Sequence, residues 1–75
     1  MTNSSWSLND LTINPDRNPA IPHRFTREKM LVLGWLIFNQ KDRTFYNMAR
    51  DCSLNIHQCE ITVQQLIELD IIRFR

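Results

Sequence analysis

The chain has 75 residues, of which 43% are hydrophobic and 23% charged, a composition that indicates one folded domain and argues against disorder. Nine basic and eight acidic side chains give a net charge of +1, so the molecule as a whole neither attracts nor repels a polyanion strongly. Two cysteines are too few for the disulfide framework of a small secreted domain.

The apolar segments show no sign of a membrane span or a secretion signal. The longest apolar run, residues 30–38, is far shorter than the roughly 20 residues that a membrane-spanning helix requires. The first 25 residues lack the basic-then-apolar pattern of a signal peptide. We therefore expect a cytoplasmic, intracellular protein that does not associate with membranes.

Residues 1–24 predict an extended N-terminal arm outside the core. They are rich in Asn, Ser, Asp and Pro, and each of the three prolines disfavours helix at the preceding residue. Within this arm Trp6 and Leu8, then Leu11 and Ile13, alternate with polar residues at the period of a short strand. We expect residues 11–14 to pair with another strand edge.

Residues 25–75 predict three helices and a final strand. Thr26, Thr44 and Asn55 are N-cap residues, whose side chains accept hydrogen bonds from the first-turn amides. They open helices from residue 26 to the polar turn at 39–42, from about 44 to 52, and from 55 to about 69. The alternating, β-branched residues 71–75 suit a strand.

The three helices carry different apolar patterns. The first has two apolar rows, which predict packing on two sides: Met30, Leu33 and Ile37 in one, Leu31, Trp35 and Phe38 in the other. The second has a single buried face of Phe45, Met48, Ala49 and Cys52. The third repeats apolar residues at Ile56, Cys59, Val63, Leu66, Ile67 and Ile71.

From Ala49 onward the sequence resembles the winged-helix branch of the helix-turn-helix superfamily. That pattern has a small residue in the second helix, then apolar, turn, apolar and cap positions, which are filled here by Cys52, Ser53, Leu54 and Asn55. Apolar residues then follow at Cys59, Val63 and Leu66, and an aliphatic pair, Ile71 and Ile72, leads into the first wing strand. The resemblance covers about residues 26–75 and implies a mainly α, three-helix fold of the winged-helix type.

The chain departs from the family pattern in three places. Ser53 stands where a turn glycine is usual, and Asp70 stands where a glycine commonly ends the third helix. The second wing strand is missing, so the β-strand pair is short or incomplete. We expect the arm strand at 11–14 to take its place beside residues 72–74.

The resemblance implies a small, non-enzymatic regulator of transcription that binds double-stranded DNA with its third helix in the major groove. The residues expected to contact base edges are Asn55, His57, Gln58, Gln64 and Gln65. Those expected to contact phosphates are Lys41, Arg43, Arg50, Arg73 and Arg75. Against this, the third helix has no Lys or Arg and carries Glu60 and Glu68, and phosphate neutralisation supplies most nonspecific affinity.

The alternative is an adaptor or inhibitor that uses the same scaffold to bind a partner protein. Its contact residues would be Trp6, Tyr46, Ile56 and Ile61, and the acidic third helix favours it over DNA binding. For a DNA-binding regulator of this build a homodimer is expected, because two half-sites multiply modest affinities, and the arm or the face of the first helix that carries Trp35 would form the contact.

Metal binding and catalysis are not expected. Cys52, His57 and Cys59, with His23 upstream, have the side chains of a zinc site, but their spacing fits no standard zinc finger and both cysteines fall on core positions. A Cys-His nucleophile would need a pocket and an oxyanion donor, for which three short helices leave little room. We expect no enzyme, no cofactor and no small-molecule substrate.

Overall fold

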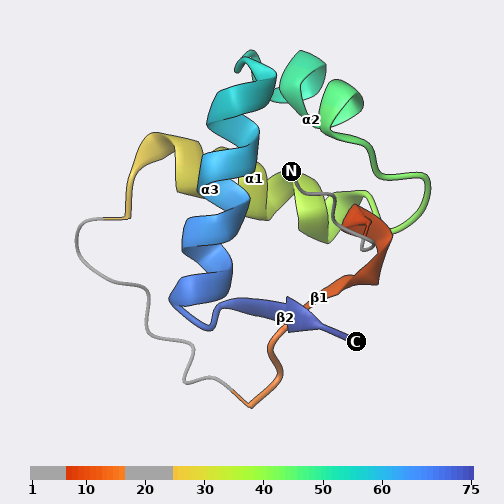
Figure 1. Cartoon of the computed structure of the whole chain (residues 1–75), viewed down its shortest axis with the longest axis vertical. Helices are drawn as coiled ribbons and strands as arrows, with labels where there is room; N and C mark the ends of the chain where they lie inside the picture. The colour runs from red at the N-terminus through yellow and green to blue at the C-terminus, as the bar shows by residue number, and fades with distance from the viewer. Residues whose placement is uncertain (1–6, 17–24) are drawn as a thin grey trace.

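Three helices and a two-stranded sheet make up the described part of the chain. The computed structural model describes residues 7–16 and 25–75, so Trp6 lies outside the described residues. A 3₁₀ helix (Leu8–Asp10) leads into β1 (Leu11–Ile13), and then follow α1 (Arg27–Phe38), α2 (Phe45–Cys52), α3 (Ile56–Glu68) and β2 (Ile72–Phe74). The predicted mainly α fold with a short strand pair is confirmed, and the layout is compatible with a winged helix (Figure 1).

Each of the three α-helices begins at its predicted cap. The side chains of Thr26 and Thr44 accept hydrogen bonds from the third backbone amide of the following helix, at 3.2 Å and 3.0 Å. Asn55 does the same for α3 at 2.7 Å. Helix starts were predictable because a cap satisfies an otherwise unpaired amide within four residues of itself.

The predicted pairing of the arm strand with the C-terminal strand is confirmed. β1 and β2 are antiparallel, with Leu11 opposite Phe74 and Ile13 opposite Ile72. A strand that precedes α1 therefore occupies the place expected for a second wing strand (Figure 1). The strand period predicted from Leu8 onward is wrong at its start, because Ser7 caps a short 3₁₀ helix there.

The described part of the N-terminal segment belongs to the core, contrary to the prediction of an arm outside it. Leu8 and Leu11 are fully buried beside Val32, Met48 and Leu66. A domain this small buries only about 60% of its unfolded surface, so apolar residues from outside the helices complete its core. Asn14 is also buried, and its amide donates to the Asp70 carbonyl oxygen at 3.0 Å.

Helix α1 packs on one side only, so the prediction that both of its apolar rows are buried is wrong. Trp35 is in the core with Val32 and Leu36, whereas Met30, Ile37 and Phe38 are exposed to 56%, 48% and 88%. The reason is that α2 and α3 both contact α1, and the residues that α1 buries, Val32, Trp35 and Leu36, share one side of it. No helix in the described part of the chain is long and apolar enough to span a membrane.

Ser53 and Asp70, which stand where the family pattern has glycine, both have left-handed backbone. Ser53, which ends α2, has φ 58°, and Asp70, which follows α3, has φ 62°. The positions therefore need the conformation that glycine adopts without a steric penalty, although the residues present have a Cβ.

We expect Ser53→Gly to stabilise the fold by about 0.5–1 kcal/mol and Asp70→Gly by less, because Asp tolerates left-handed backbone better than Ser. The check is the midpoint of urea unfolding for each variant. Ser7→Gly is the control, because Ser7 is an extended N-cap (φ −127°) where glycine relieves no strain. A loss of stability in Ser53→Gly would show that its left-handed backbone is not strained.

Candidate functional site

The joint between α2 and α3 forms the helix-turn-helix. Ser53 in the left-handed region reverses the chain, and the next amide, that of Leu54, donates to the Ala49 carbonyl oxygen at 3.0 Å. Ala49 and Cys52 on α2 and Cys59 on α3 are buried together in the core. The small side chain of Ala49 allows the two helices to approach closely, as the sequence pattern predicted.

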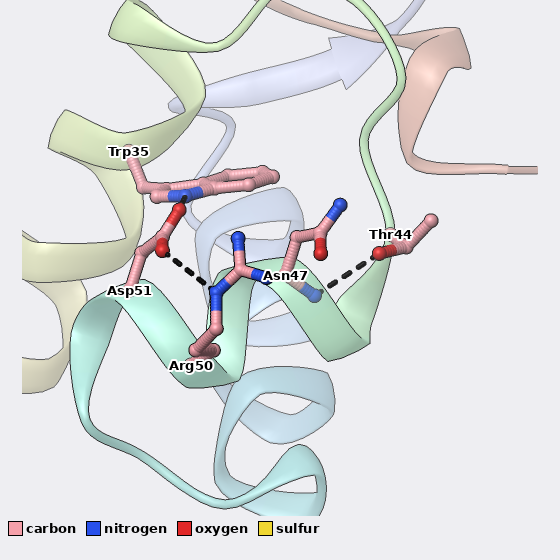
Figure 2. A network of polar contacts seen from close by, with 5 residues as sticks. All are labelled: Trp35, Thr44, Asn47, Arg50 and Asp51. Carbon is pink, nitrogen blue, oxygen red and sulfur yellow. Dashed lines mark hydrogen bonds and ion pairs between the residues drawn. The ribbon is translucent and has the colours of Figure 1, made fainter.

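A polar contact fixes α2 on α1 beside this joint. The Trp35 indole Nε1 donates to Asp51 Oδ2 at 2.8 Å, and Arg50 Nε lies 3.2 Å from Asp51 Oδ1 (Figure 2). The hydrogen bond from Trp35, followed by the hydrogen bond from Arg50, lowers the pKa of Asp51 below its ordinary value. Trp35 therefore has a structural role, and its face of α1 is not free to form a dimer.

The outward face of α3 is polar and exposed. His57, Ile61, Gln64 and Glu68 follow one another at the 4-3-4 spacing of a single helical stripe. Gln65 is exposed on one flank of this stripe. The structure thus brings His57, Gln64 and Gln65 together on the face where base-reading side chains were predicted.

Asn55 and Gln58 differ from these three because they hold the start of α3. The Gln58 amide donates to Asn55 Oδ1 at 2.7 Å, and the Asn55 amide donates to Gln58 Oε1 at 3.0 Å. Reading an adenine in the bidentate way uses both the oxygen and the nitrogen of a side-chain amide. Since both oxygens are occupied in this capping box, base contact by Asn55 or Gln58 would compete with the helix cap.

A depression of about 260 Å³ separates the flank of α3 from the start of α1. It is lined by Thr26, Glu28, Lys29, Gln58, Ile61, Thr62 and Gln65. Lys29 therefore stands next to the outward face of α3, although it is 36 residues from Gln65 in sequence. Sequence reasoning left Lys29 out of the site, and only the packing of α1 on α3 reveals it.

Four of the five predicted phosphate contacts are exposed. Arg50 pairs with Asp51 and Arg73 pairs with Asp16, at 3.2 Å and 3.4 Å, both on the surface. Among the described residues, Lys41 and Arg75 form no ion pair. Surface pairs of this kind contribute little stability, so Arg50 and Arg73 can exchange their partners for a phosphate at small cost.

The fifth, Arg43, is buried with only 6% of its surface exposed, so its assignment as a phosphate contact is wrong. Its guanidinium donates to four backbone carbonyl oxygens, those of Leu8, Leu11, Leu36 and Asn39. Burial, and to a lesser degree the Arg75 guanidinium, lowers the pKa of Arg43 from its ordinary value. Two of the carbonyls end α1, where a cation is favoured by the helix dipole, so the role of Arg43 is structural.

The two thiols lie in the core. Cys52 and Cys59 are free and buried, and burial raises the pKa of each. Groups of three or more His, Cys, Asp or Glu side chains suited to a metal ion are absent from residues 7–16 and 25–75. His57, the third residue of the zinc alternative, is exposed on α3.

Among the described residues of the protein-binding alternative, Ile56 and Ile61 do not share one face of α3. Tyr46, on α2, and Ile56 and Ile61, on α3, are exposed, but Ile56 and Ile61 are five positions apart and point about 140° away from each other around the helix.

No family model, curated protein or solved structure matches this chain. The winged-helix resemblance therefore rests on the residue pattern and the layout of the elements.

We expect Arg43→Met to destabilise the fold by about 3–5 kcal/mol, because four buried carbonyl oxygens lose a charged donor. Lys41→Met, two residues away and exposed, is the control and should change stability by less than about 0.5 kcal/mol. Thermal unfolding followed by circular dichroism measures both. Equal stability of the two variants would show that the buried guanidinium is not needed.

The lowered pKa of Asp51 predicts a pH dependence. A carboxylate with a lowered pKa in the folded state stabilises the fold at higher pH and loses that effect as the pH falls through its folded value. Asp51→Asn should therefore lower the melting temperature at about pH 7, and this difference should shrink as the pH falls through the lowered pKa of Asp51. A difference that persists at low pH would mean that the charge of Asp51 is not the cause.

Proposed function

We propose that this chain is a small, non-enzymatic helix-turn-helix module that binds duplex DNA through the outward face of α3. The observation that carries the proposal is that His57, Gln64 and Gln65 lie together, exposed, on the second helix of a well-formed helix-turn-helix. None of the three side chains makes a hydrogen bond within the described residues. Side chains of these types can donate to and accept from base edges in the major groove.

We assign a role in DNA binding to each of these side chains from its exposure. His57, Gln64 and Gln65 would contact bases, whereas Asn55 and Gln58 would chiefly keep the start of α3 in place. The phosphate contacts would be Lys41, Arg50, Arg73 and Arg75, with Lys29 in place of the buried Arg43. This proposal uses five cations, all of which lie outside α3.

The negative charge of α3 limits the affinity of the chain for DNA. Glu60 and Glu68 are exposed on α3 and repel phosphates, so a single copy of the chain is expected to bind weakly. Glu60 lies nearer the N-terminal end of α3, which enters the groove most deeply in helix-turn-helix complexes. Removing its charge should therefore strengthen DNA binding, whereas a protein-binding role through other surfaces predicts no such gain.

The test is a salt titration of binding to a random duplex, measured by fluorescence anisotropy. With three to five phosphate contacts, the logarithm of the association constant should fall with the logarithm of salt at a slope of about −2.7 to −4.5. Glu60→Gln should raise the affinity about two- to fivefold, by relief of one repulsion at the DNA surface. Glu68→Gln, at the far end of α3, is the matched control and should have a smaller effect.

Two results would contradict the proposal. One is the absence of binding at low salt by both the natural chain and Glu60→Gln. The other is an equal gain in Glu60→Gln and Glu68→Gln, which would mean that net charge matters and that the N-terminal end of α3 does not lie closer to the DNA than its far end. In either case a partner protein becomes the better explanation of the exposed surface.

A further inference from the structure

Helix α1 presents an apolar face to the solvent, on the side opposite the core. This outward face of α1 consists of Met30, Gly34, Ile37 and Phe38, with Leu33 half-buried at its edge. Phe38 is 88% exposed, the highest value among the exposed large hydrophobic residues. A surface helix with one free side normally carries polar residues there, so apolar residues on both sides indicate that something covers this face.

We propose that a second copy of this chain covers it, with the two α1 helices packed antiparallel. The face has a projection and a notch, as a symmetric dimer requires. Phe38 projects from it, and one helical turn away Gly34 has no side chain and no atom within 4 Å of the place where a Cβ would stand. A twofold axis between them seats each Phe38 ring over the Gly34 of the other copy, so that one contact is made twice.

The charges select the antiparallel arrangement. The face itself is uncharged, and Arg27 stands at its N-terminal end. A parallel pair would bring the two Arg27 side chains together, whereas in the antiparallel pair each Arg27 lies nine residues from the twofold axis, so the two are about 27 Å apart along the helices. The antiparallel arrangement also sets the positive end of each helix dipole beside the negative end of the other.

The area of the outward face of α1 determines how tightly the two copies are expected to bind each other. An aromatic side chain buries about 150–250 Å² when covered, and Phe38 with Met30 and Ile37 offers about 400 Å² per copy. With Phe38 seated over Gly34 the two helices overlap along residues 34–38, so Met30 stays at the edge and the two copies together bury less than about 800 Å². This is below the 1,200–2,000 Å² of a stable interface, so the dimer is expected to be weak and to form at micromolar or higher concentration.

Sedimentation equilibrium of the full chain, from about 10 μM to 1 mM, tests the proposal together with two variants on the face. Phe38→Ser removes the projection, and Gly34→Leu fills the notch. Each should raise the dissociation constant at least about tenfold. Tyr46→Ser, which removes an exposed aromatic residue from α2, is the control and should leave the constant unchanged.

The variant Gly34→Leu distinguishes a specific dimer contact from nonspecific hydrophobic association. It adds apolar surface, so unspecific association would increase, whereas a filled notch weakens a dimer that seats Phe38 there. The variant should fold, because an added side chain meets no atom within 4 Å and leucine favours helix more than glycine does. Stronger association of Gly34→Leu, or a natural chain that stays monomeric over the whole range, would overturn the proposal and leave the face to a different protein or to another segment of this chain.

Discussion

The buried guanidinium of Arg43 holds together parts of the chain that the helices alone would not join. It donates to carbonyl oxygens of the N-terminal 3₁₀ helix and β1, Leu8 and Leu11, and of the C-terminal end of α1, Leu36 and Asn39. Its own backbone amide donates to Asn9 Oδ1. The start of the chain is thereby fastened to α1 and to the loop that leads into α2. The pairing of β1 with β2 and the burial of Leu8 and Leu11 both depend on this attachment.

The same arrangement determines which surfaces are free. The N-terminal segment closes the core next to the strands, and α2 and α3 share one side of α1. Two exposed faces of different chemistry remain. That of α3 is mainly polar and acidic, with His57 and Gln64 along its middle and Gln65 on one flank, whereas that of α1 is apolar and uncharged. A polar helix face suits base edges, and an apolar face suits protein, so the two surfaces have separate roles in our proposals.

Local features were predictable wherever the physical cause lies within a few residues. The caps at Thr26, Thr44 and Asn55 bind amides three positions away, and the left-handed turns at Ser53 and Asp70 fall where the family pattern has glycine. The buried faces of α2 and α3 follow from helical spacing. The pairing of residues 11–14 with residues 72–74 was also predictable, because a strand with an apolar residue needs a partner edge and the chain offers one.

What the sequence determined, then, is the number, bounds and order of the helices and the set of exposed polar residues on α3. Tertiary structure alone decided the roles of three residues: Arg43 in the core, Phe38 on the surface and Lys29 beside α3. Burial depends on which elements pack together. The local sequence around a cation or an aromatic ring does not show whether that side chain is buried or exposed. When a helix is apolar on two sides, its sequence does not show which side is buried. The packing of the neighbouring elements decides this.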